Sequence, residues 1–261
     1  MRILFIGDIF AKSGRKAISE KLSLIKKNYD IDFVIANAEN ASHGRSLTID
    51  HYNQLIGYGI NVMTMGNHTF DHQLAYITLK NAKWILRPHN IKNSTNEAKY
   101  GKGTILLKIK NKLIRITNLV SQQCFNKFQT INPFVALEKI LSCAKKSDLH
   151  IVDFHAETTS EKKAFLLHFA GKVSAILGTH THVQTADEQV YNNTFFITDV
   201  GMTGPKDGII GAKAEPIIKM FCGKSKHFKM EPARGKYQFN AVVMQWNDQT
   251  LQPEKIIRIN F

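Results

Sequence analysis

Residues 173–182 read Val-Ser-Ala-Ile-Leu-Gly-Thr-His-Thr-His. The run from Val173 to Leu177 is apolar and has the length of a strand, and the polar segment Gly178-Thr179-His180 follows it directly. A short apolar run that ends at a glycine predicts a strand buried on both faces. Because His180 and His182 alternate, both rings would lie on one face of an extended segment. This stretch therefore predicts a buried strand with two metal-ligand side chains at its end.

The same arrangement, an apolar strand followed by a residue of metal-ligand type, occurs at four other places. The strands are Arg2 to Ile6, Phe33 to Ala36, Val62 to Met65 and Leu149 to Phe154, and they end at Asp8, Glu39-Asn40, Asn67-His68 and His155. Ligands bind beyond the carboxyl ends of strands in open α/β sheets, so we expect these ends to converge. Taken alone, Asp8 could instead cap a helix and His155 could be an ordinary core histidine.

The combination of side chains at these strand ends favours particular metals. Carboxylates and imidazoles suit iron, manganese and zinc, and thiolates are absent from the set. Two such cations close together can acidify a shared water and clamp a phosphoryl group, and Glu39 is the carboxylate placed to bridge them. Asp153, Glu157 and Asp199 could orient the histidines, with helix capping as the alternative.

Strand and helix patterns alternate along the chain, with added hairpins. Helical periodicity covers Gly14 to Lys27, Thr48 to Leu55, Asp71 to Leu79 and Pro133 to Ala144, and Thr158 with Glu161 predicts a capping box for a further helix. Gly103 to Ile109 and Leu113 to Leu119 predict a hairpin, Phe195 to Thr198, Phe239 to Trp246 and Lys255 to Ile259 predict strands, and Gly201 to Gly211 predicts a loop. The pattern predicts one mixed sheet or two stacked sheets with helices outside.

Length and composition favour one folded domain over residues 1–261. The chain is 43% hydrophobic and 10% aromatic, and no linker or repeat divides it. No apolar run approaches the roughly 20 residues of a membrane span, and the first residues do not resemble a signal peptide. Three widely spaced cysteines, Cys124, Cys143 and Cys222, fit a reducing compartment. We therefore expect a cytoplasmic protein with no membrane partner.

The charge balance favours anionic partners. The 35 basic and 21 acidic residues give a net charge of +14, which attracts phosphates, nucleotides or RNA over a long range. Lysine pairs at 26–27, 145–146 and 162–163 fall on predicted helix surfaces, and no arginine-rich arm is present. A solvated basic surface with no specific partner is the alternative.

Longer blocks around the strand ends resemble a known family. Gly66-Asn67-His68 and Gly178-Thr179-His180-Thr181-His182 are similar to signature blocks of the calcineurin-like metallophosphoesterases. Two blocks depart from that superfamily: Asp8-Ile9-Phe10 replaces its Asp-x-His, and Ala38-Glu39-Asn40 replaces its Gly-Asp. Both departures resemble the YmdB-like bacterial 2′,3′-cyclic-nucleotide phosphodiesterases. The resemblance covers essentially the whole chain and includes the blocks AENA (38–41), TMGNHT (64–69), DFHAE (153–157), GTHTHVQTAD (178–187) and ITDVGMTGP (197–205).

The resemblance implies a four-layer α/β/β/α sandwich with mixed sheets and a site for two divalent or mixed-valence metal ions. It implies iron as the first candidate and manganese as the second. One metal would be held by Asp8, Glu39, Asn40 and His182, and the other by Glu39, Asn67, His155 and His180. His68 would donate a proton to the leaving oxygen. A metal-bridged hydroxide would open a 2′,3′-cyclic nucleotide to a 3′-nucleotide, although the residues alone do not determine which bond breaks.

Two other functions remain open at this point. The charge of +14 would also suit an RNA-associated regulatory protein whose turnover is incidental. A phosphomonoesterase or protein phosphatase would use the same dinuclear site with a different substrate pocket. The small phosphodiester is the first candidate partner and RNA the second, and the oligomeric state is not predicted.

Overall fold

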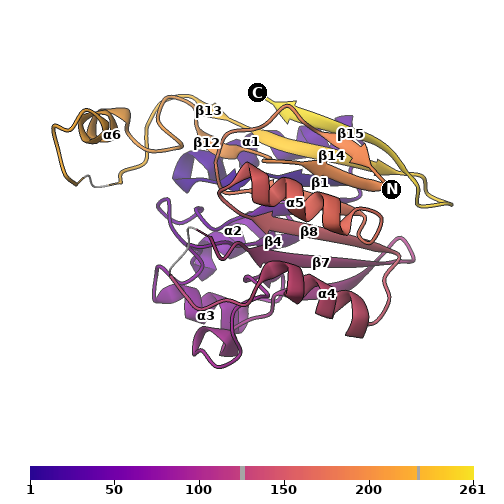
Figure 1. Ribbon diagram of the computed structural model, residues 1–261. Helices are drawn as coiled ribbons and strands as arrows, with labels where there is room; N and C mark the ends of the chain where they lie inside the picture. The colour runs from indigo at the N-terminus through magenta and orange to yellow at the C-terminus, as the bar shows by residue number, and fades with distance from the viewer. Residues whose placement is uncertain (124–126, 228–229) are drawn as a thin grey trace.

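The computed structural model describes residues 1–123, 127–227 and 230–261, and it contains two six-stranded sheets and one small sheet (Figure 1). The first sheet has the order β15 (Pro253–Asn260), β14 (Asn240–Trp246), β1 (Arg2–Ile6), β3 (Phe33–Asn37), β4 (Val62–Thr64) and β5 (Ile85–Leu86). The second has the order β10 (Gln189–Tyr191), β11 (Thr194–Ile197), β9 (Ala175–Thr179), β8 (Leu149–His155), β7 (Lys112–Val120) and β6 (Thr104–Ile109). The small sheet joins β13 (Tyr237–Gln238), β12 (Met202–Pro205) and β2 (Asp8–Ile9).

Helices cover the outer face of each large sheet. The helices of the described residues are α1 (Ala11–Asn28), α2 (Ile49–Gly57), α3 (Leu74–Asn81), α4 (Pro133–Cys143), α5 (Thr159–Phe169) and α6 (Ala214–Phe221), with a short 3₁₀ helix, η1 (Glu97–Lys99). Figure 1 shows α4 and α5 lying over β7 and β8, whereas α6 extends away from the body of the molecule.

Strand alternation divides most of the described apolar side chains among three large cores, and Phe10, Ala11 and Met202 form a fourth, small cluster. In β1, Ile3 and Phe5 face the second sheet, whereas Leu4 belongs to the core under α1 and α2. In β8, Ile151 faces the first sheet, and Phe154 packs with the side chains of α4 and α5. Helices on one side, two sheets between and helices on the other side make a four-layer α/β/β/α sandwich, so the predicted fold is confirmed.

Parallel pairing brings the predicted strand ends together. β1 pairs in parallel with β3, and β3 with β4, while β8 pairs in parallel with β7 and β9. The carboxyl ends in each sheet therefore lie at one edge. Asp153 joins these edges across the sandwich, because its Oδ2 accepts hydrogen bonds from Thr64 Oγ1 at 2.5 Å and Asn37 Nδ2 at 3.2 Å.

Several local predictions differ from the structure. The segment Gly201 to Gly211 contains strand β12, which pairs with β2. The capping box is wrong: Thr158 stands at the N-cap of α5 without a side-chain cap bond, and Glu161 accepts a hydrogen bond from Ser121 Oγ instead. The helix expected from Asp71 begins at Leu74.

Some predictions concern the chain as a whole. Cys143 and Cys222 are free and exposed, and Cys124 lies outside the described residues. Within the described ranges, none of the helices is both long and apolar enough to span a bilayer. The organisation of residues 1–261 as a single domain stays a prediction.

Candidate metal centre

Asp8, Asn40 and His182 form one group of ligand-type side chains. Asp8 belongs to β2 directly after β1, and Asn40 lies in the turn after β3. His182 Nε2 is 3.3 Å from Asn40 Oδ1 and 3.8 Å from Asp8 Oδ1. All three residues are buried. Asn40 donates its side-chain Nδ2 to the Gly44 carbonyl, which leaves its Oδ1 directed at His182.

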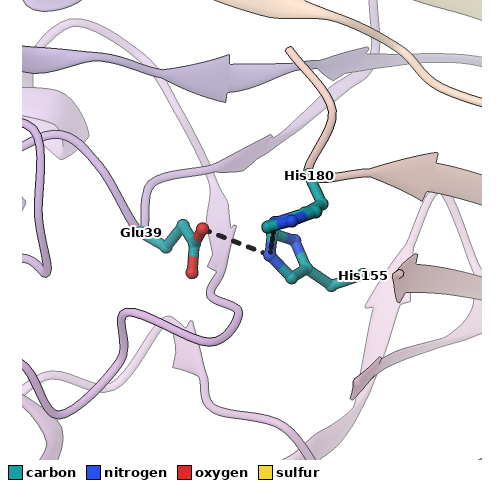
Figure 2. A group of neighbouring side chains, drawn as sticks. All are labelled: Glu39, His155 and His180. Carbon is teal, nitrogen blue, oxygen red and sulfur yellow. Dashed lines mark hydrogen bonds and ion pairs between the residues drawn. The ribbon is translucent and has the colours of Figure 1, made fainter. Parts of the chain in front are cut away.

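Glu39, Asn67, His155 and His180 form a second group, and three of them are drawn in Figure 2. His155 Nε2 lies 3.2 Å from Glu39 Oε1, 2.8 Å from Asn67 Oδ1 and 3.1 Å from His180 Nδ1. One ligand atom each from Glu39, His155 and His180 lies within 4.8 Å of the others, as a metal site requires. His180 Nε2 lies 2.8 Å from Glu157, a half-exposed carboxylate at the rim.

The ring orientation of His155 is determined by a chain of hydrogen bonds. The Thr179 hydroxyl donates its one proton to Asp153 Oδ1 at 2.7 Å. The 2.8 Å contact between that hydroxyl and His155 Nδ1 must therefore use a proton on the ring nitrogen. In the neutral ring this leaves the Nε2 lone pair toward Glu39 and Asn67, which is the tautomer that a metal ligand needs.

The tautomer of His182, in the group with Asp8 and Asn40, follows from its hydrogen bonds in the same way. His182 Nδ1 lies 2.8 Å from the carbonyl oxygen of Ile210, which can only accept, so in the neutral ring Nε2 carries the lone pair. Asp8 Oδ1 is fully buried and accepts no hydrogen bond within the described residues. A buried carboxylate oxygen in that state costs free energy unless a cation lies nearby. Both groups therefore fit a bound metal ion.

The electrostatics of the cluster point in the same direction. Burial raises the pKa of Asp8 well above its ordinary value. Burial alone would also raise the pKa of Glu39, but the facing His155 ring lowers it below its ordinary value. Burial opposes protonation of His155, yet Glu39 and Asp8 raise its pKa to about 9. Buried carboxylates thus need positive charge beside them. A proton on His155 or a bound metal ion can supply that charge.

The segment that carries His180 and His182 is not extended as predicted. Both residues have positive φ angles, 106° and 66°, so their rings separate into the two groups instead of sharing one face. Such backbone costs free energy and persists only when neighbouring structure holds it. Alternation in the sequence could not reveal this turn.

A buried ion pair holds this segment in place. Lys162 of α5 is fully buried, which corrects its predicted place on a helix surface. Its ammonium donates to the Thr179 carbonyl at 2.9 Å and to Asp199 Oδ2 at 2.8 Å. The same Asp199 oxygen accepts the Thr181 amide at 3.0 Å. Asp199 therefore holds the backbone between the two histidines, whereas Asp153 acts through Thr179.

His68 lies beside the second group and has partners that sequence reasoning missed. Its backbone amide donates to Glu39 Oε2 at 2.8 Å, and its ring Nδ1 lies 2.6 Å from Asp71 Oδ2. Lys127 reaches both, with Nζ 2.8 Å from His68 Nδ1 and 2.7 Å from Asp71 Oδ2. Asp71 comes three residues after His68, so this contact could have been predicted from the sequence. Lys127 lies 56 residues beyond Asp71, so its contact could not.

Comparison with known proteins places the chain in a family. The family described as YmdB-like protein matches residues 4–259. The chain belongs to the YmdB-like family. The matched range, residues 4–259, contains all the ligand-type residues of both groups and His68.

Relatives and solved structures extend over the same length. A 2′,3′-cyclic-nucleotide 2′-phosphodiesterase of Bacillus subtilis is 40% identical over 99% of this chain and 96% of its own. The crystal structure of a novel phosphatase from Mycoplasma pneumoniae is 40% identical, has a TM-score of 0.95, and is matched over 100% of this chain and 93% of that one. A hypothetical protein from Thermus thermophilus is 34% identical, with a TM-score of 0.90 and coverage of 100% and 99%.

We predict that Lys162→Met destabilises the fold by about 3–5 kcal/mol, because it leaves Asp199 buried without its cation. Urea unfolding would measure this loss. The double variant Lys162→Met/Asp199→Asn should recover most of it, since no buried charge remains unpaired. The exposed neighbour Lys163 is the matched control, and Lys163→Met should cost less than about 1 kcal/mol. Equal losses for the two single variants would contradict the importance of the buried pair.

Proposed function

We propose that this chain is a metal-dependent phosphodiesterase that opens 2′,3′-cyclic nucleotides to 3′-nucleotides. The observation that carries the proposal is the convergence of two groups of ligand-type side chains that meet at Glu39. Glu39 Oε1 faces His155 of one group, and Asp8 of the other group contributes to the raised pKa of the same ring. The name of the Bacillus subtilis relative supports phosphoesterase activity and motivates the choice of a cyclic nucleotide.

Two cations would be held by the two groups. The first would take Asp8, Asn40 and His182, the second Asn67, His155 and His180, with Glu39 shared. Iron or manganese suits this set of carboxylate, amide and imidazole ligands. When bound, the pair would supply an acidified water as nucleophile and neutralise charge on the phosphate.

His68 is proposed to protonate the departing 2′ oxygen. Its amide is bonded to Glu39, so its ring sits at the edge of the ligand cluster, and its side chain is 17% exposed, so substrate can reach it. Asp71 restrains the ring at Nδ1 and Lys127 pairs with the same carboxylate, so the remaining nitrogen, Nε2, is the one proposed to act on the substrate. An alkoxide is a poor leaving group, and a positioned acid typically contributes 10²–10⁴-fold.

A phosphomonoesterase is the second candidate, because the Mycoplasma pneumoniae structure is named a phosphatase. The two candidates differ in whether the scissile phosphate carries one ester bond or two. The monoester product of the first activity is the substrate of the second. A short panel of substrates therefore separates them.

We predict that the enzyme loaded with manganese or iron hydrolyses 2′,3′-cyclic AMP with a higher kcat/KM than p-nitrophenyl phosphate. The product should be the 3′-monophosphate, identified by chromatography against both isomers. Protein stripped with a chelator is the control and should turn over neither substrate. A higher kcat/KM for the monoester would favour the phosphomonoesterase, and a 2′-monophosphate product would refute the proposed bond cleavage.

We predict that His68→Ala lowers kcat on 2′,3′-cyclic AMP by roughly 10²–10⁴-fold. The loss on bis-p-nitrophenyl phosphate should be much smaller, because the phenolate leaves without a proton. Asp71→Asn should show the same contrast with a smaller loss, since it loosens the ring without removing the acid. Metal content is measured on each sample. Equal losses on both substrates, or a lost metal, would assign His68 to binding instead of proton transfer.

A further inference from the structure

A cavity of about 430 Å³ lies next to the first ligand group. Its walls come from three parts of the chain that are distant in sequence: the start of α1, the turn after β3, and the base of the excursion that carries α6. Its lining includes Lys12, Lys16, His43, Lys213, Glu231 and Arg234. None of them is among the proposed metal ligands.

The cavity lining is strongly basic. Lys12, Lys16, Lys213 and Arg234 contribute four cationic side chains, and Glu231 is the one carboxylate. Glu231 already pairs with Lys213 at 2.5 Å. Lys12 and Arg234 form no ion pair with any residue that the structure describes, so the cavity presents cations that an anionic ligand can engage.

The cavity wall is joined to the metal-ligand group through the backbone. The amide of Ala11, which lines the cavity, donates to the Asn40 carbonyl at 2.9 Å, and the Gly44 amide donates to the same oxygen at 3.1 Å. His43, which directly precedes Gly44 in the chain, also lines the cavity. Phe10 directly precedes Ala11 in the chain, and its ring centroid lies 5.6 Å from that of His182. A ligand in the cavity would thus lie beside residues that contact the first ligand group.

We propose that this cavity binds the phosphate on the 5′ side of a terminal nucleoside, so that the substrate class is RNA ending in a 2′,3′-cyclic phosphate. This inference rests on the proposed function and extends it from mononucleotides to oligonucleotides. Water adds to the cyclic phosphorus, the bond to the 2′ oxygen breaks, and that oxygen takes a proton. The products are an RNA 3′-phosphate and a free 2′ hydroxyl.

The distribution of charge favours a phosphodiester chain over a lone mononucleotide. Lysine and arginine contact backbone phosphates and position a strand without reading its sequence. A mononucleotide has no phosphate left for the cavity once its cyclic phosphate occupies the metal site. An oligonucleotide places a second negative charge beside the first, which gives Lys12 and Arg234 a partner.

The test compares three substrates of the manganese-loaded protein: 2′,3′-cyclic AMP, 2′,3′-cyclic AMP with an added 5′-phosphate, and the dinucleotide ApA with a terminal 2′,3′-cyclic phosphate. We expect kcat/KM for the dinucleotide to exceed that for the mononucleotide by at least about tenfold, the effect of one hydrogen bond to a charged group. In Lys12→Ala and Arg234→Ala this ratio should fall toward one. Lys27→Ala, which removes an exposed charge at the far end of α1, is the matched control and should keep the ratio.

The outcomes separate the inference from the proposed function. Equal kcat/KM for all three substrates overturns the subsite and leaves the phosphodiesterase intact. A gain that Lys27→Ala removes as fully as Arg234→Ala assigns the preference to overall charge and overturns the subsite. A gain with the 5′-phosphate but none with the dinucleotide overturns RNA as the substrate class. Hydrolysis of none of the cyclic substrates refutes the proposed function itself.

Discussion

The structure depends on the contact between Glu39 and His155 at the centre of the sandwich. Glu39 is buried, and its carboxylate is stable there only because an imidazole faces one oxygen and the His68 amide binds the other. Asp8 places a second buried carboxylate close enough to contribute to the raised pKa of the same ring. Buried carboxylates require positive charge beside them, and the ligand-type side chains around Glu39 and Asp8 fit a bound metal ion.

The two sheets form this contact together. β3 brings Glu39 from one sheet and β8 brings His155 from the other, and Asp153 fixes the relation between them. Asp153 accepts hydrogen bonds from Thr64 in the first sheet and from Thr179 in the second, and Thr179 in turn orients the His155 ring. The residues that close the sandwich therefore also determine which nitrogen of His155 faces the ligands. The same hydrogen bonds therefore stabilise the fold and orient the side chains of the site.

The strand ends could be predicted because their signal is local. Apolar runs followed by Asp8, Glu39 or His155 follow from the period of a strand and from the common edge of parallel strands. Left-handed backbone at His180 and His182 has no such signal, since neither residue is a glycine. Lys162 resembled a surface lysine because its partner, Asp199, is 37 residues away in sequence. Contacts that only the assembled sandwich creates could not be predicted from periodicity.

Metal content shows whether Glu39 bridges two cations. The measurement is metal per chain by elemental analysis for the protein with its natural sequence, Glu39→Ala, Asp8→Ala and the exposed control Glu138→Ala, each reconstituted with manganese and desalted. We expect two ions for the natural sequence and for Glu138→Ala, about one for Asp8→Ala, and none for Glu39→Ala, with folding confirmed by circular dichroism. Two ions retained by a folded Glu39→Ala protein would contradict the bridging position of Glu39.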